Sequence, residues 1–462
     1  MKRISRVTVL AILALLAACA VGPDYKRPPV ETPKAYKEAY GVWRQAKPQA
    51  AFGRGAWWKI YKDPILDGLE RQVDLSNQNL KAADAAYRES DAAVGETRAA
   101  LFPAVTLDSS VGRMQGTMPR PMQPDSLYGT ASWVPDLWGR IRRNVESASA
   151  KVQASADDLA SARLSMQAML ATNYFDLRAQ DELRRLLNAE AEADRKNLQI
   201  VKHQYDTGTG DAADVLAAQM QLENIEAQAV NAGNRRARLE HAIAVLIGKP
   251  PTEFSLPPQK YVGYAPDIPP GLPSALLERR PDIAAAEREM AAANAQIGVA
   301  TAAWFPDFTL SASAGYASMA LGKFMQAADS FWAVWPSLAE TVFDAGAREA
   351  RIAQARAGYD RSVAMYRQTV LTAFQQVEDS LAAQHILMEQ RKTQEASALH
   401  AHEAEQLAYR RYMNGVAPYN NVLTAKAVAL KDDQKLLMVR EARLDASIAL
   451  IEALGGGWKA HN

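Results

Sequence analysis

This 462-residue chain has almost no net charge, very little cysteine and few long apolar runs. The formal net charge is +1, so the composition indicates neither a basic surface for nucleic acid nor an acidic, disordered tail. Cys19 is the only cysteine. After the N-terminus there is no run of about 18 apolar residues that would form a transmembrane helix. Any membrane crossing must therefore be made by strands.

Motifs that carry catalytic chemistry are missing as well. No glycine-rich phosphate loop follows a predicted strand, and no G-x-S-x-G motif occurs. His400 and His402 are two residues apart on a predicted helix, so they point to different faces and make a poor metal site. We therefore predict that the protein is not an enzyme and binds no metal or cofactor.

Proline is absent from two long stretches, Gly139 to Tyr205 and Gly346 to Tyr412. Apolar side chains recur along both at spacings of three, four or seven, which predicts one buried stripe on a helix. A globular helix seldom exceeds about 25 residues, whereas each stretch would reach about 100 Å at 1.5 Å per residue. A plain alanine-rich coiled-coil rod is one alternative, but it does not explain the strands predicted between the helices.

The N-terminus has the pattern of a lipoprotein signal peptide. A basic start precedes a short apolar region, Val7 to Leu16, and Leu16-Ala17-Ala18-Cys19 resembles a bacterial lipobox. Cleavage after residue 18 would leave Cys19 to carry lipid, and several acyl chains would anchor the chain firmly. Ala20 follows, and in similar lipoproteins a residue other than Asp favours the outer membrane. The alternative is an ordinary signal peptide with an incidental cysteine.

The remaining elements occur in two similar sets. The first set has a helix from Ile65 to about Leu101, strands Val105 to Val111 and Leu127 to Val134, a long helix, and a helix from Asp211 to Ile247. Residues 116–125 read as a loop between these strands. The second set has a helix from Ser274 to Ala303, strands Phe308 to Tyr316 and Phe331 to Trp335, and the second long helix.

Two motifs repeat in the same order. Phe102-Pro103 matches Phe305-Pro306, and Tyr205-x-x-Gly208 matches Tyr412-x-x-Gly415 at an offset of 207 residues. The chain is therefore predicted to be a tandem duplication. We expect a signal peptide (1–18), a lipidated strap (19–60), a first repeat (61–270), a second repeat (271–457) and a short tail (458–462).

The strands set the predicted architecture. Four strands cannot close a membrane barrel, because the smallest such barrels have about eight, and an open sheet edge in lipid is costly. A barrel must therefore be shared between chains. Aromatic residues near the strand ends suit a membrane interface, namely Tyr128, Trp133, Tyr316, Phe331, Trp332 and Trp335. A soluble β-domain on a coiled coil is the alternative.

The chain resembles outer-membrane efflux proteins of the TolC and OprM type, and among these it is similar to the lipoprotein branch. The matching residues are Gly22-Pro23-Asp24-Tyr25, Trp57-Trp58, the two Phe-Pro pairs and Arg279-Arg280-Pro281-Asp282-Ile283. The resemblance implies a homotrimer with one twelve-stranded barrel and a long α-helical barrel in the periplasm. It also implies three partners: a periplasmic adaptor protein, an inner-membrane RND-type transporter and outer-membrane lipid.

In this family the tunnel closes at the two helix–turn–helix tips, here at the turns of Gly208 and Gly415. The resemblance implies a periplasmic gate made by Asp214, Tyr412, Asn420, Asn421 and Thr424. Relatives often have aspartates where this chain has Asn420, Asn421 and Thr424, so block by cations is in doubt. Alternatively, Asp211 and Asp214 only cap and charge-balance a helix start.

The predicted function is that of an outer-membrane exit duct of a tripartite efflux pump for drugs or other small molecules. A type I secretion channel for proteins would use the same architecture, since fold does not separate classes of cargo. A periplasmic tether without a pore is the third alternative.

Overall fold

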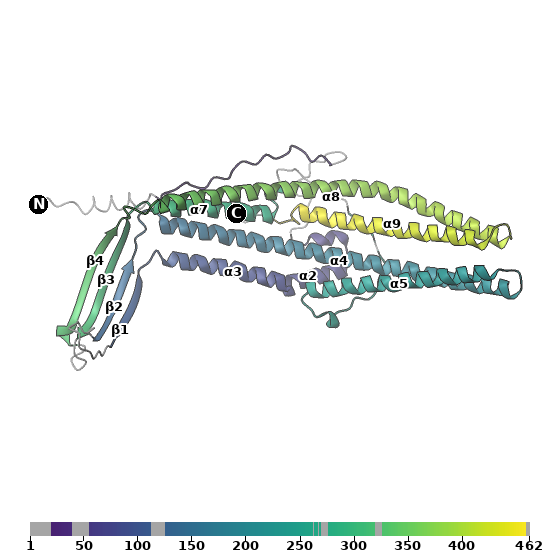
Figure 1. The fold of residues 1–462 in the computed structure, drawn as a ribbon, viewed down its shortest axis with the longest axis horizontal. Helices are drawn as coiled ribbons and strands as arrows, with labels where there is room; N and C mark the ends of the chain where they lie inside the picture. Colours follow the sequence, from purple (N-terminus) through teal and green to yellow (C-terminus); the bar gives the residue numbers. More distant parts are fainter. Residues whose placement is uncertain are drawn as a thin grey trace. The chain divides into compact units, whose positions relative to one another are not determined.

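The computed structural model describes residues 20–38, 55–111, 125–261, 263–266, 268, 276–318 and 326–458. Cys19, the signal peptide and most of the predicted 116–125 loop lie outside these residues. The elements occur in two similar sets, in which two strands lie in sequence between helices (Figure 1), with these bounds: η1 Trp57–Tyr61, α2 Pro64–Ser76, α3 Gln78–Ala99, β1 Ala104–Ser110, β2 Asp125–Trp133, α4 Arg140–Asp206, α5 Ala212–Leu246, η2 Pro251–Glu253, α7 Pro281–Ala302, β3 Asp307–Ser318, η4 Ala327–Asp329, β4 Ser330–Ala339, α8 Ala347–Met413 and α9 Tyr419–Ala453.

The two long helices and the duplication are confirmed. α4 and α8 have 67 residues each. α8 begins and ends 207 residues after α4, and the bounds of α9 follow those of α5 by the same 207 residues. No helix in the described part of the chain is both long enough and apolar enough to cross a membrane.

Two predicted helices are interrupted in the structure. The helix expected from Ile65 to Leu101 is broken at Asn77, whose side chain donates to Leu246 O (2.7 Å) and accepts from Leu80 N (3.1 Å). Asn77 thus caps the start of α3 and holds α5. The helix expected from Ser274 to Ala303 is interrupted by a turn at residues 277–279, and α7 begins at Pro281, because the residue before a proline disfavours helical backbone and proline suits a first turn. Ser274 itself lies outside the described residues.

The four strands form one antiparallel sheet in the order β1-β2-β3-β4. The chain divides into two compact units, each of which takes residues from both repeats. The first unit comprises residues up to 30, 84–157 and 284–369, and it contains the sheet. In it α4 packs on α7, where Ser147 donates to Ala292 O at 3.0 Å. Trp138 stacks on Phe305 with ring centroids 4.8 Å apart.

The second unit comprises residues 31–83, 158–283 and those from 370 onward. Its main apolar core surrounds Trp57, Leu170 and Tyr174, all almost fully buried. The hydroxyl of Tyr174 donates to Asp63 (2.6 Å), and Asp63 also caps α2. Leu170, Tyr174 and Leu177 of the apolar stripe that predicts α4 are therefore part of this core.

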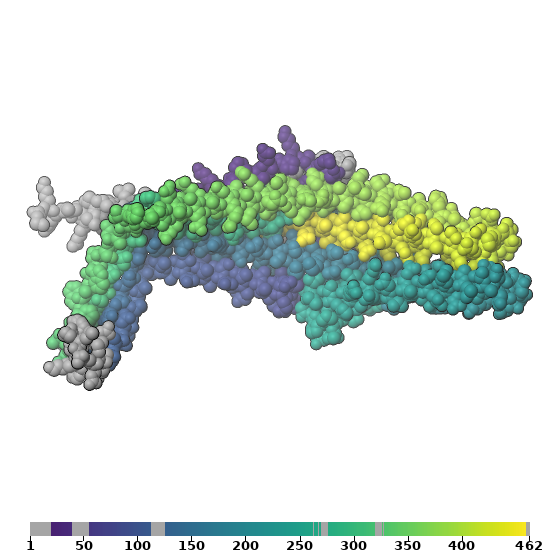
Figure 2. All heavy atoms as spheres, in the orientation of Figure 1, coloured from purple at the N-terminus to yellow at the C-terminus, as the bar shows by residue number. Residues whose placement is uncertain are grey.

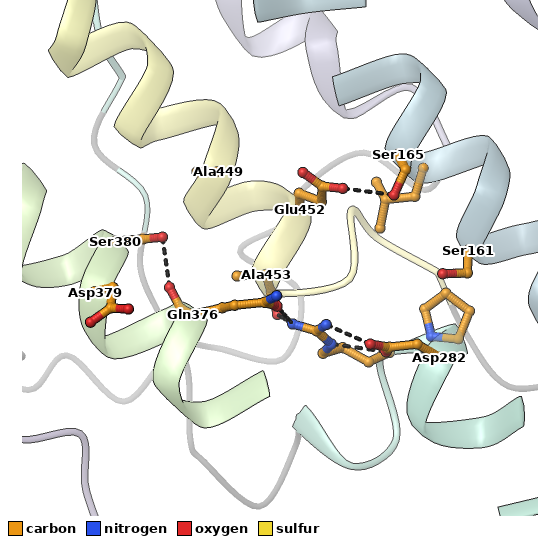
Figure 3. Close-up of a pocket in the computed structure, with 12 residues that line it drawn as sticks. Ser161, Ser165, Asp282, Gln376, Asp379, Ser380, Ala449, Glu452 and Ala453 are labelled. Carbon is orange, nitrogen blue, oxygen red and sulfur yellow. Dashed lines mark hydrogen bonds and ion pairs between the residues drawn. The ribbon is translucent and has the colours of Figure 1, made fainter. Parts of the chain in front are cut away.

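The Arg279-Arg280-Pro281-Asp282 segment has a structural role in the second unit. Arg280 donates to both carboxylate oxygens of Asp282, to Gln376 of α8 (2.8 Å) and to Ala453 O at the end of α9 (3.1 Å). These bonds, shown in Figure 3, border a polar cavity of about 450 Å³. Arg280 thereby joins the start of α7 to the last carbonyls of α9, which favour a cation.

Candidate functional site

The helix tips predicted to form a gate lie in the second unit, where α4 turns into α5 and α8 into α9. In the first turn Gly208 N donates to Tyr205 O (2.9 Å) and Thr209 N to Gln204 O (2.8 Å). Gly415 and Val416 repeat this pattern in the second turn, with Gly415 N donating to Tyr412 O at 2.8 Å. Both glycines have φ of at least +70°, which only glycine adopts without strain. Gly208 and Gly415 therefore lie in the turns that join α4 to α5 and α8 to α9.

An apolar cluster holds the four helix ends together behind these turns. Its buried members are Leu198, Val201, Ala218, Tyr419 and Val422. The rings of Tyr412 and Tyr419 lie 5.1 Å apart. The Tyr412 hydroxyl donates to Gln204 Oε1, a bond that joins the end of α8 to the end of α4. Within one chain, therefore, apolar packing and this bond both help to hold the tip together.

Asp214 lies close to the tyrosines of this cluster. Burial raises the pKa of Tyr412, and the nearby Asp214 carboxylate raises it further. Burial raises the pKa of Asp214 itself, and the Asp211 carboxylate adds to that rise. Asp211 also accepts from Ala213 N (3.0 Å) and so caps α5, as the alternative interpretation expects. The structure thus brings Asp214 and Tyr412 together.

The other three predicted gate residues point elsewhere. Asn420, Asn421 and Thr424 are exposed, and Thr424 bonds only to Asn420 O of its own helix (2.9 Å) in the described contacts. Asn420 and Thr424 line a cavity of about 430 Å³ between α5 and α9, with a second of about 520 Å³ beside it. α5 (teal) and α9 (yellow) run together along this part of the unit in Figure 2.

A buried ion pair near the tip was missed by the sequence reasoning. Lys426 of α9 contacts Asp194 of α4 at 2.6 Å and Glu190 at 3.0 Å. The side chains of Lys426 and Asp194 are 5% and 2% exposed. Both charges occupy positions of an apolar stripe, since Lys426 follows Tyr419 and Val422, and Asp194 follows Leu187 and Ala191. Opposite charges at positions of two apolar stripes are the sequence feature from which this buried ion pair could have been predicted.

The sheet is the second candidate region, and its two faces differ. Directly paired residues point to the same side, so the register puts Val105, Leu107, Ala312, Ala314 and Val334 on one apolar face. Thr106, Asp108, Thr130, Ser311 and Ser313 share the opposite, polar face. The period-two alternation that the sequence predicts from Val105 and from Phe308 onward is confirmed along β1 and β3.

The predicted aromatic residues divide between these faces. Trp133, Tyr316 and Trp332 share the apolar face, while Tyr128, Phe331 and Trp335 lie on the polar face. Among the strands the structure describes, β1 and β4 are each paired along one edge only. An apolar face flanked by unpaired strand edges suits a lipid environment only if another chain pairs with those edges.

Comparison with known proteins identifies relatives along nearly the whole chain. The toluene efflux pump outer membrane protein TtgC of Pseudomonas putida is 30% identical over 461 residues, 97% of this chain and 95% of that protein. Outer membrane protein OprJ of Pseudomonas aeruginosa is 29% identical over 468 residues, 98% of this chain and 96% of that protein.

Solved structures agree with these relatives. The outer-membrane channel OprN matches with a TM-score of 0.85 and 30% identity, over 95% of this chain and all of that one. The open state of the Neisseria gonorrhoeae MtrE channel matches with a TM-score of 0.83 and 26% identity, over 96% of this chain and 99% of that one. The family described as "Outer membrane efflux protein" matches twice, at residues 70–249 and 272–456. The chain belongs to this family of non-enzymatic outer-membrane efflux proteins.

Proposed function

We propose that the chain is the outer-membrane exit duct of a tripartite efflux pump for small molecules. The observation that carries this proposal is the sheet, with one apolar face, one polar face and two unpaired edges in the described chain. Three copies joined β1 to β4 would close a twelve-stranded barrel with the polar face inside. The related proteins are named for toluene, solvent and antibiotic efflux, so we propose small apolar or amphiphilic cargo.

Two measurements on purified protein test this function. The mass in mild detergent is expected to be that of a trimer, because a lone chain leaves strand edges unpaired. The same preparation is expected to give discrete conductance steps in a planar bilayer. A stable monomer would contradict the shared barrel, and trimers without conductance would favour the tether. Accumulation of dyes and antibiotics in a deletion strain separates small-molecule efflux from protein secretion.

The contacts of the residues that follow Cys19 support the proposed lipid anchor. Val21 N donates to Trp138 O (3.1 Å), just before α4, and Arg143 binds Asp24 at 2.7 Å. The residues after Cys19 are thus held at the junction of β2 and α4. In a barrel of the proposed kind this junction is the periplasmic rim, where acyl chains on Cys19 would enter the outer membrane.

Cys19→Ala is expected to abolish lipidation, because only the thiol can carry it. Radiolabelled palmitate should label the native protein and not the variant. Cys19→Ser, which keeps the size but loses the thiol, serves as the matched variant. Equal labelling of the alanine variant and the native protein would exclude the lipobox interpretation.

A periplasmic adaptor protein and an inner-membrane RND-type transporter are the proposed partners. The exposed cavities between α5 and α9 are a suitable place for an adaptor helix, since they lie along two neighbouring helix surfaces close to the tips. Gln434 donates to Gln228 across this surface at 3.1 Å, so the two helices are held in fixed register.

The proposed gate is formed by both tips of each chain. Asp214, Tyr412 and Gln204 would keep the four helix ends together, while Asn420, Asn421 and Thr424 would bond to neighbouring copies. Neutral hydrogen bonds contribute about 0.5–1.5 kcal/mol each, so three copies suffice for a contact that opens reversibly.

Replacing Asn421 and Thr424 by alanine is therefore expected to raise single-channel conductance, with little change in block by divalent cations. Asn234→Ala is a control for loss of an exposed amide on α5 outside the two cavities. Strong block of the native channel by micromolar divalent cations would mean that an acidic ring closes the pore at another place.

A further inference from the structure

Four residues form a row across the sheet, one on each strand, near the end remote from the helices. Asp108 of β1 pairs with Tyr128 of β2, Tyr128 pairs with Gly315 of β3, and Gly315 pairs with Phe331 of β4. Cross-strand partners project to the same side. The row therefore lies on the polar face, among hydroxyl-bearing side chains.

The two aromatic rings of the row meet over the glycine. Their centroids are 5.9 Å apart and their planes are inclined by 56°. A Cβ atom on Gly315 would lie 2.4 Å from Tyr128 Cα, so this position excludes any side chain. Phe331 is 37% exposed. The rings thus cover the backbone at Gly315 and present aromatic surface on the polar face, which also carries Trp335.

A carboxylate stands at the end of the row. Asp108 is exposed, and its Oδ2 accepts from the Thr106 hydroxyl at 3.1 Å. Thr106 is itself bonded to Thr130 on β2 at 2.6 Å. These bonds orient the Asp108 carboxylate on the same face as the rings, and directly opposed side chains lie about 5 Å apart.

We propose that this row is a binding site for planar aromatic cations. Ring faces attract both aromatic planes and positive charge, and the carboxylate adds a second attraction for the cation. The inference rests on the proposed barrel, in which the polar face lines the pore and three copies of the row surround the mouth. Such a site would make the proposed duct bind planar aromatic cations in preference to other cargo molecules.

The test uses ethidium, a planar aromatic cation, titrated by fluorescence onto the full-length protein in lipid nanodiscs. Phe331→Leu and Tyr128→Leu are each expected to weaken ethidium binding roughly threefold to tenfold. Asp108→Asn is expected to weaken it also. Trp332→Leu is the matched control, because Trp332 is the next residue on β4 and lies on the opposite, apolar face. An excess of tetraethylammonium, a cation without a ring, should displace less ethidium than the same concentration of N-methylquinolinium, a planar aromatic cation.

Equal ethidium affinity in Phe331→Leu and Trp332→Leu would overturn the site, as would displacement by tetraethylammonium as efficient as that by N-methylquinolinium. Circular dichroism and the trimer mass show whether each variant is folded, and Asp108→Asn keeps the proposal testable if an aromatic variant is not. Conductance of the same preparations separates the two proposals. Conducting channels with unaltered ethidium binding refute the site alone, whereas trimers that never conduct refute the pore.

Discussion

Lys426→Met is expected to destabilise the helix ends strongly, by about 3–5 kcal/mol, because it leaves a buried carboxylate without its cation. Burial opposes the charge of Lys426, but Asp194 and Glu190 outweigh it and keep its pKa raised. Asp194 is 2% exposed and would have to be buried as an anion or take up a proton. The thermal unfolding temperature, measured by helical circular dichroism, should fall by several degrees.

Lys431→Met is the matched control, since Lys431 is exposed on the same helix and should change stability by less than about 0.5 kcal/mol. A triple variant that also carries Asp194→Asn and Glu190→Gln should regain much of the loss, because no unpaired charge remains. Equal unfolding temperatures for the two lysine variants would show that Lys426 is not paired inside the folded tip.

The ends of the long helices were predictable because local chemistry sets them. No proline interrupts α4 or α8, and glycine at position 208 or 415 terminates each helix in a turn that needs a positive φ. The strands were predictable for the same kind of reason, since their alternation has a period of two. The break at Asn77 was not, because it depends on a bond to Leu246 O, 169 residues away in sequence.

At the tips, equivalent residues of the two repeats have different surroundings. Tyr205 and Tyr412 occupy equivalent positions of the two repeats, yet Tyr205 is 49% exposed whereas Tyr412 is bonded to Gln204 and packs on Tyr419. The sequence pattern predicted a role for Asp214 and Tyr412 in the tip. It did not predict the hydrogen bond that Gln204 accepts, because that bond depends on the register between two separate helices. The repeated sequence motif thus predicts the turn, but it does not predict which residue Tyr412 contacts.

The second large effect concerns Glu70 of α2, which is fully buried on the stripe of Leu66, Leu69 and Val73. Neither of its carboxylate oxygens has a hydrogen-bond partner among the residues that the structure describes. Burial raises the pKa of Glu70 to about 9, and the carboxylates of Asp74 and Asp67 contribute to the rise. Glu70 is therefore protonated in the folded protein at neutral pH.

Glu70→Gln is expected to stabilise the protein increasingly as the pH rises. In the unfolded chain Glu70 loses its proton near pH 4.5, whereas in the folded chain it keeps the proton up to about pH 9. Between these values the folded state holds the extra proton, so its stability falls with rising pH and the fall ends near pH 9. Each pKa unit corresponds to about 1.4 kcal/mol, which sets a ceiling of about 4 kcal/mol between pH 5 and pH 8.

Unfolding temperatures of the native protein and the glutamine variant, measured from pH 5 to pH 9, check this expectation. The two should nearly coincide at pH 5 and separate steadily above it, with the variant the more stable. Glu89→Gln, at an exposed position of α3, should follow the pH dependence of the native protein. Parallel curves for native protein and Glu70→Gln across the range would mean that Glu70 is ionised in the fold, and hence that a cation or water reaches it.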